Sequence, residues 1–201
     1  MRYRPSHFLF FIFSCLVILI LTVVIVQNNF RPFYNRADSP APTSILQPLQ
    51  TAQNSEAESP DGTMKLVLKT QTQPDGNNTY SIFIETTAGE NRKLLFTTTG
   101  RENFSLSPNS WSPDNVYVFL TQKRNNGVNV LVFKANGDPF VNNLQYVDLS
   151  SYFEKTLTDR KIIDVTGWDA TTLLHVKTQV VNSSEKGSYW FDVTNFSFIQ
   201  L

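Results

Sequence analysis

A repeated stretch of turn residues, each followed by an alternating strand, constrains the fold of this chain more than any other feature. Residues 110–122 read SWSPDNVYVFLTQ, in which Pro113 fixes φ and Asp114 favours a tight corner by bonding to the local backbone. Trp111 is expected to form part of the fold by packing its large apolar face on the neighbouring sheet. Residues 59–71 (SPDGTMKLVLKTQ) and 168–179 (WDATTLLHVKTQ) read alike, and the stretches beginning at the two tryptophans align without a gap at an offset of 57. Such self-similarity predicts stacked β units, none of which can bury its face alone.

Short alternating strands separated by polar turns are predicted along this whole region. A non-strand insertion is expected at residues 146–158, where the spacing of Ser151 and Glu154 is that of a capping box and predicts one or two helical turns. The expected strands are 64–71, 79–86, 93–98, 116–122, 128–134 and 188–193, with one more within 168–179 and further strands around 103–106 and 196–200, and the turns include 73–77, 88–91, 123–127 and 135–138.

The pattern Trp-Ser-Pro-Asp-Gly/Asn, strand, polar turn, strand, then Asn-Gly-Asp or Ala-Gly-Glu, resembles the WD40-like repeat of TolB-type β-propellers. In that family, Ser-Pro-Asp-Gly opens a strand of a blade and a glycine-containing turn closes the next hairpin. The resemblance covers residues 58–201 and weakens in the third repeat, where Asp169-Ala170-Thr171 replaces Ser-Pro-Asp. It implies an all-β domain of about three propeller-like repeats, an open or partial propeller, because closed rings have about four to eight blades.

A transmembrane helix is predicted at residues 8–26 (FLFFIFSCLVILILTVVIV), an uncharged run that would span about 28 Å as a helix. A cleavable signal peptide is the alternative, but no small-x-small site follows the run directly. Cys15 lies inside the run, whereas a lipidated cysteine would end it. The short tail of residues 1–7 favours a signal-anchor, with the C-terminal domain outside the cytoplasm. Residues 27–57, rich in Pro, Gln and Asn, are expected to be a disordered tether to a domain at 58–201.

No pattern typical of catalysis, cofactor binding or metal binding occurs in the chain. The net charge is zero and no basic stripe is interleaved with aromatics, so nucleic-acid binding is not expected. The only histidines are His7 and His175, which are too few for a zinc site without cysteines, and His175 is expected at the surface or the rim of a core. No P-loop, G-x-G-x-x-G or G-x-S-x-G motif is present. The carboxylates at Asp61, Asp75, Asp114, Asp138, Asp164 and Asp169 are scattered and mostly in turns.

Three functions are compatible with these features. The first is a single-pass membrane protein that displays a β-propeller-like module and binds a protein or envelope component without catalysis. The second is a degenerate or split relative of a larger propeller protein, which works only on assembly with another chain or with itself. The third, an enzyme, would require a carboxylate pair such as Asp164 and Asp169 in one pocket. The expected partners are thus the bilayer, through residues 8–26, and an unknown protein or envelope component.

Overall fold

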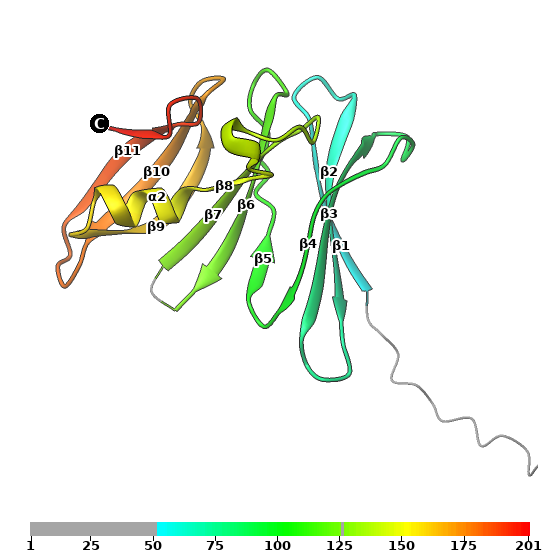
Figure 1. The fold of residues 1–201 in the computed structure, drawn as a ribbon, viewed down its shortest axis with the longest axis horizontal. Helices are drawn as coiled ribbons and strands as arrows, with labels where there is room; N and C mark the ends of the chain where they lie inside the picture. The colour runs from blue at the N-terminus through cyan, green and yellow to red at the C-terminus, as the bar shows by residue number, and fades with distance from the viewer. Residues whose placement is uncertain (1–51, 126) are drawn as a thin grey trace, which may run out of the picture. The chain divides into compact units, whose positions relative to one another are not determined.

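Three antiparallel sheets of four strands each follow one another along the chain in the computed structural model, which describes residues 52–125 and 127–201 (Figure 1). The predicted tail 1–7, the predicted membrane helix 8–26 and most of the predicted tether 27–57 lie outside the described residues. In the described part of the chain, no helix is long and apolar enough to cross a membrane.

Within each sheet the strands are hydrogen-bonded neighbours in sequence order, so every connection is a simple hairpin or loop between adjacent strands. This arrangement confirms the predicted repeated antiparallel sheets and corresponds to a partial propeller. Sheet 1 contains β1 (Ala52–Glu58), β2 (Met64–Thr72), β3 (Asn78–Thr86) and β4 (Lys93–Gly100); sheet 2 contains β5 (Asn103–Ser105), β6 (Tyr117–Arg124), β7 (Gly127–Lys134) and β8 (Val147–Asp148); sheet 3 contains β9 (Arg160–Trp168), β10 (Leu173–Val180), β11 (Lys186–Asp192) and β12 (Ser197–Gln200).

Three strands were not expected from the sequence, namely β1, β8 and β9. Strand β1 extends the β structure N-terminal of the boundary predicted at residue 58, although its sequence AQNSEAE is polar and only Ala57 is buried. Pairing with β2, with Ala57 opposite Leu66, supplies the order that its own composition does not. Strand β8 lies inside the segment predicted to be free of strands, and it is only two residues long because it pairs with β7 solely at Leu131 and Val132.

The helical turns predicted near Ser151 are confirmed as α2 (Leu149–Thr156), but the predicted cap is wrong. Asp148, the last residue of β8, is the N-cap and accepts a hydrogen bond from the backbone N–H of Ser151 at 3.0 Å. A short 3₁₀ turn (Val141–Asn143) precedes this region. The aspartate caps the helix because the strand ends at its backbone, which places its carboxylate beside the free N–H groups of the first turn.

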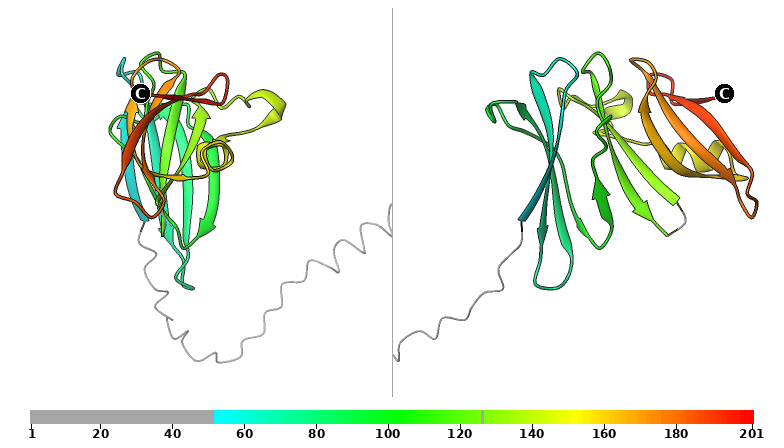
Figure 2. Two further views of the ribbon diagram at one scale, coloured as in Figure 1. Left: turned by 90° about the vertical axis from the view of Figure 1, so that its left-hand side faces the viewer. Right: turned by 180° about the vertical axis from the view of Figure 1, so that it is seen from behind.

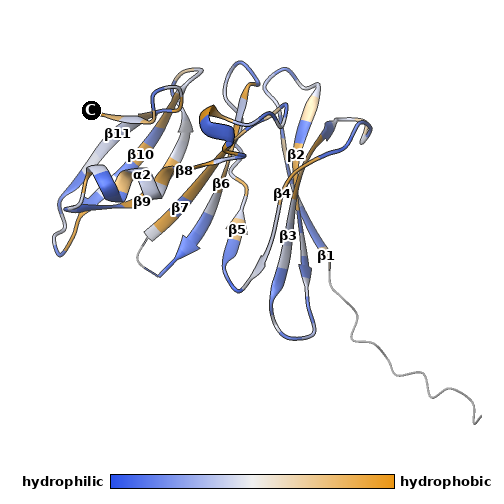
Figure 3. Ribbon diagram, in the orientation of Figure 1, coloured by the Kyte–Doolittle hydropathy of each residue, from blue (hydrophilic) through white to orange (hydrophobic). Residues whose placement is uncertain are grey.

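Two hydrophobic cores separate the three sheets, and sheet 2 contributes to both. Val118 and Leu120 on β6 point into the core shared with sheet 1, whereas Phe119 between them points into the core shared with sheet 3 and α2. Strand β7 alternates in the same way, with Leu131 and Phe133 on one side and Val130 and Val132 on the other. Burial on both faces explains why β6 and β7 read as continuous apolar runs, which Figure 3 shows as the orange parts of these strands.

The connections between strands gather at two opposite ends of the stacked sheets, which Figure 2 shows from two further sides. The sheets share these ends, because Lys93 of sheet 1 donates to the carbonyl of Asn136 beside sheet 2, and Asn109 beside sheet 2 donates to Thr166 of sheet 3. The "motif end" comprises segments 58–63, 86–93, 106–116, 134–148, 168–173 and 192–197, and the "hairpin end" comprises segments 72–78, 100–103, 123–125, 157–161 and 180–186.

Candidate functional site

The Ser-Pro-Asp turns of the first two repeats are fold-forming structures with the same hydrogen bonds. In the second repeat, Ser112 Oγ donates to Asp114 Oδ1 at 2.6 Å and accepts from the backbone N–H of Tyr117 at 2.9 Å. The positive φ of 61° at Asn115 explains why an Asn or Gly follows the aspartate. Ser59, Asp61 and Met64 make the equivalent bonds in the first repeat, at 2.6 and 3.0 Å.

The tryptophan of the motif joins each sheet to the one before it. Trp111 Nε1 donates to the carbonyl oxygen of Ala57 at 2.8 Å, and Trp168 Nε1 donates to that of Ser110 at 3.2 Å. Ala57 and Ser110 each lie two residues before the motif serine position of their own repeat, so the two bonds are structurally equivalent. The interpretation of Trp111 as a residue that forms the fold therefore extends to Trp168.

The third repeat departs from this scheme and places an exposed carboxylate, that of Asp169, at the surface. Asp169 stands where the second repeat has Ser112. Its side chain does not make the two hydrogen bonds that Ser112 Oγ makes in that turn. Its Oδ2 atom accepts a hydrogen bond from Trp190 Nε1 at 2.7 Å and lies 3.5 Å from His175 Nδ1. His175 lies at the rim of sheet 3, with 24% of its side chain exposed.

The carboxylates considered for an enzyme site do not share a site. Asp164 lies within β9 and its Oδ2 is 3.5 Å from Lys177 Nζ, whereas Asp169 follows the end of that strand and contacts His175. Five residues of extended chain separate them by about 16 Å. Each carboxylate thus has its own cationic or hydrogen-bonding neighbour, and the two do not form an acid–base pair.

Equivalent positions of the three repeats meet in a pocket of about 510 Å³ at the motif end. The position before the motif serine is Glu58 in the first repeat, Trp111 in the second and Trp168 in the third, and all three line this space. Pro60 and Pro113 of the motif turns line it as well, together with Asp169. We call these six residues the motif-end pocket. Its members come from all three sheets, so the pocket exists only because the sheets are stacked.

Aromatic packing fixes the wall of the motif-end pocket. The ring of Trp168 stacks on that of Tyr117 with 5.9 Å between centroids and 22° between planes, and Phe140 stacks on the other side of the Tyr117 ring. Burial among these rings, helped by the nearby charge of Asp114, raises the pKa of the Tyr117 hydroxyl. The phenol therefore stays neutral at physiological pH, and Trp168 is held in one orientation.

The electrostatic character of the motif-end pocket is acidic. Glu58 and Asp169 both line it, and no lysine or arginine does. The side chain of Glu58 is exposed and has no hydrogen bond or ion pair with another residue in the described part of the chain. The whole motif end carries eight acidic and three basic side chains. A ligand for this pocket would be cationic or rich in hydrogen-bond donors, with an apolar part to contact the indole.

Sequence reasoning identified part of this pocket for other reasons. Trp111 and Asp169 were singled out, the first as a fold-forming residue and the second as half of an enzymatic pair. Glu58 and Pro60 were missed, although the alignment of the repeats contains the signal that would find them. It places Glu58 opposite Trp111 and Trp168, a charged residue at a position that is otherwise aromatic.

Comparisons with known proteins give distant structural similarity only. No family model and no curated protein matches the sequence. TolB from Acinetobacter baumannii is similar with 14% sequence identity and a TM-score of 0.42, over 76% of this chain and 32% of that one. A variant of the AtxE2 isopeptidase has 12% identity and a TM-score of 0.46, over 76% and 31% of the chains, and a putative TolB from Agrobacterium tumefaciens has 9% and 0.28, over 75% and 80%. The chain thus spans about a third of the first two proteins (32% and 31%).

Proposed function

We propose that this protein is a single-pass membrane-anchored, β-propeller-like module that binds a basic segment of a protein or envelope component without catalysis, with its β domain outside the cytoplasm. The observation that carries the proposal is the motif-end pocket, which is lined by two carboxylates and by parts of the Trp111 and Trp168 side chains. The anchor is the predicted helix 8–26, an uncharged apolar run long enough to span a bilayer.

The chemistry of the motif-end pocket favours lysine or arginine side chains. A cation over the face of Trp168 is attracted by the ring, and Glu58 offers an unpaired carboxylate on the opposite repeat. Pro60 and Pro113 lose little conformational entropy on binding because their φ angles are already fixed. The surplus of acidic side chains at the motif end adds a long-range attraction that increases the association rate.

A labelled oligolysine peptide tests this proposal with the full-length protein in detergent micelles. We expect binding, measured by fluorescence anisotropy, to weaken by about tenfold in Glu58→Gln and in Asp169→Asn, since one well-placed charge contact corresponds to about 1.4 kcal/mol. Glu90→Gln is the matched control, because Glu90 is an exposed carboxylate of the motif end that does not line the pocket. Equal losses in all three variants would show that only the general field attracts the peptide, and the pocket would not be the site.

Assembly with another chain is a second candidate function, favoured by the outer face of sheet 3. Ile199 and Leu201 are 44% and 52% exposed on or beside the last strand, which pairs only with β11 among the described strands. Exposed apolar residues next to a free strand edge are a common means of association. Sedimentation equilibrium of the full-length protein in micelles tests this function, and a monomer at all concentrations would argue against obligate self-assembly.

A further inference from the structure

The hairpin end of the domain has the opposite electrostatic character to the motif end. It carries six basic and four acidic side chains, against three basic and eight acidic ones at the motif end. The described residues are therefore strongly polarised, although the whole chain has no net charge. The basic side chains of the hairpin end are Arg101, Lys123, Arg124, Arg160, Lys161 and Lys186.

The part of the chain that contains the predicted anchor joins the domain at this same basic end. Ala52, the first described residue, pairs with Gln71 next to the hairpin that connects β2 and β3. Residues 1–51 therefore continue from the hairpin end and not from the motif end. An anchored domain would have its basic end nearest to the point at which the tether arrives.

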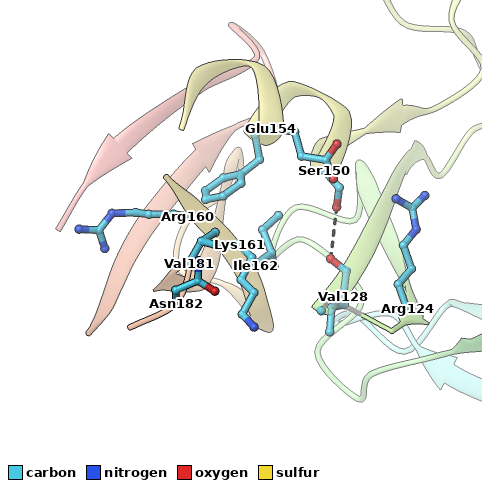
Figure 4. Close-up of a pocket in the computed structure, with 11 residues that line it drawn as sticks. Arg124, Val128, Ser150, Glu154, Arg160, Lys161, Ile162, Val181 and Asn182 are labelled. Carbon is cyan, nitrogen blue, oxygen red and sulfur yellow. Dashed lines mark hydrogen bonds between the residues drawn. The ribbon is translucent and has the colours of Figure 1, made fainter. Parts of the chain in front are cut away.

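A cleft of about 380 Å³ opens at the hairpin end between β7, α2 and β9 (Figure 4). Val128, Phe153 and Ile162 supply apolar lining, and Ser150 Oγ donates to the carbonyl of Val128 across one side at 3.3 Å. Gly127 makes this close approach of the sheets possible, since a Cβ atom there would lie 2.3 Å from the carbonyl oxygen of Ile162. The cleft is thus a fixed feature of the packing between sheets 2 and 3.

The cations around this cleft differ in whether they have partners. Arg160 is paired with Glu185, with 3.0 Å between Nη2 and Oε1. Arg124 and Lys161 also line the cleft, and neither side chain makes a hydrogen bond or ion pair within the ranges 52–125 and 127–201; the same holds for the side chain of Lys123 nearby. Unpaired cations at a shared surface are available for an anionic ligand.

The spread of the charges indicates what kind of anion they fit. Figure 4 shows Arg124 on the β6 side of the cleft and Arg160 extending away from the cleft on the other side. The Lys161 side chain points in a third direction. A single phosphate or carboxylate could not contact all of them. A surface with many anionic groups, such as lipid headgroups, could contact all of them.

We infer that the hairpin end lies against the anionic headgroups of the bilayer in which residues 8–26 are anchored, with Lys123, Arg124 and Lys161 as the main contacts. This inference rests on the anchor of the proposed function. A leaflet that contains anionic lipids attracts the basic end and repels the acidic motif end, so the domain is oriented as well as held. In that orientation the motif-end pocket faces away from the membrane.

Energy transfer from the domain to the lipid headgroups tests the orientation with the full chain. The chain carries Cys15→Ser so that one new cysteine can be labelled, and it is reconstituted in nanodiscs with an acceptor dye on the headgroups. The donor is placed at Ser184→Cys in the hairpin end or at Thr171→Cys in the motif end; both residues are exposed. Replacing part of the phosphatidylcholine by phosphatidylglycerol is expected to raise transfer from Ser184→Cys about twofold and to leave transfer from Thr171→Cys unchanged or lower.

Changes in ionic strength and in the basic side chains test the inference independently by the same energy-transfer measurement. In the chain without charge substitutions, higher ionic strength should abolish the increase in energy transfer, since the attraction to the headgroups is screened beyond a Debye length. The combined variant Lys123→Gln, Arg124→Gln and Lys161→Gln should also abolish it, whereas Lys69→Gln, an exposed lysine of sheet 1, should not. A transfer that does not depend on phosphatidylglycerol, or that rises equally from both labels, overturns the inference, as does retention of the increase in the combined variant.

The outcomes also separate this inference from the proposed function. A chain that does not co-elute with the nanodiscs refutes the anchor, and with it the orientation. Co-elution without lipid dependence refutes the orientation alone, and binding of labelled oligoglutamate without lipid dependence would assign the cations to an acidic protein instead. The combined variant should still bind oligolysine with unchanged affinity, because its substitutions lie at the end opposite to the motif-end pocket.

Discussion

Replacing Trp111 by Phe tests whether the motif tryptophan holds neighbouring sheets together. The indole is 5% exposed, and its Nε1 donates to the carbonyl oxygen of Ala57 at 2.8 Å. Phe keeps an aromatic ring at the interface but cannot donate a hydrogen bond. Loss of a buried donor costs about 1 to 3 kcal/mol, and the smaller ring leaves a gap that adds to this, so we expect a loss of about 2 to 3 kcal/mol in the free energy of unfolding.

Trp168→Phe is the matched variant, because it removes the equivalent bond of the next interface. Its Nε1 donates to the carbonyl oxygen of Ser110 over a longer distance, 3.2 Å, and the ring is only partly buried at the wall of the motif-end pocket. Water can replace the lost donor there, and the stacking on Tyr117 is retained with Phe. The expected loss is therefore smaller, about 1 kcal/mol.

Urea unfolding of the full-length protein in micelles, followed by far-ultraviolet circular dichroism, measures both losses without relying on tryptophan fluorescence. The two midpoints are compared at a common slope. The reasoning fails if Trp168→Phe is as destabilising as Trp111→Phe, since burial and bond length would then not govern the cost. It fails as well if neither variant changes the midpoint, because the indole bonds would then contribute nothing to the stacking of the sheets.

Four other substitutions test separate parts of the structure by the same unfolding measurement. Gly127→Ala should cost about 2 kcal/mol or more, because φ is +143° and its Cβ would meet backbone, whereas Gly76→Ala, at φ +81° in open space, should cost about 1 kcal/mol. The hydrogen bond from Arg92 lowers the pKa of Glu85 below its ordinary 4.5, so Glu85 stabilises the fold above that pH and loses this contribution as the pH falls through the lowered value; Glu85→Gln should flatten the acid loss. Asp169→Ser should change stability by less than about 1 kcal/mol, while weakening oligolysine binding about tenfold as Asp169→Asn does; a large loss of stability would make Asp169 a structural residue.

The extent to which the sequence predicts this fold depends on whether the determining contacts are local. The turn around Ser112 and Asp114 is closed by bonds within five residues, so its motif is readable in one stretch of sequence. Strand β1 could not be found in this way, because its polar residues become a strand only through pairing with β2. The helix cap was assigned to Ser151 for the same reason, since the competing Asp148 depends on where β8 ends.

The motif-end pocket could be predicted only in part, because it combines residues from three repeats. Trp111 and Asp169 are visible in the sequence as members of a pattern, but their proximity follows from stacking of the sheets. Glu58 is the clearest case. It is an ordinary acidic residue of a polar stretch until the alignment places it opposite two tryptophans. Its role as a lining residue then requires the pairing of β1, which the sequence does not reveal.

The accumulation of acidic side chains at one end of the domain follows from the repetition of a turn that an aspartate closes. Aspartate closes the motif turn because its carboxylate accepts bonds from nearby donors, and the antiparallel order of strands returns that turn to the same end of every sheet. Carboxylates chosen for turn geometry therefore accumulate at the motif end. Basic side chains are in excess at the other end, where the cleft of Arg124 and Lys161 lies. A residue that forms the fold in one repeat thus contributes, across three repeats, to a field that can orient the whole domain.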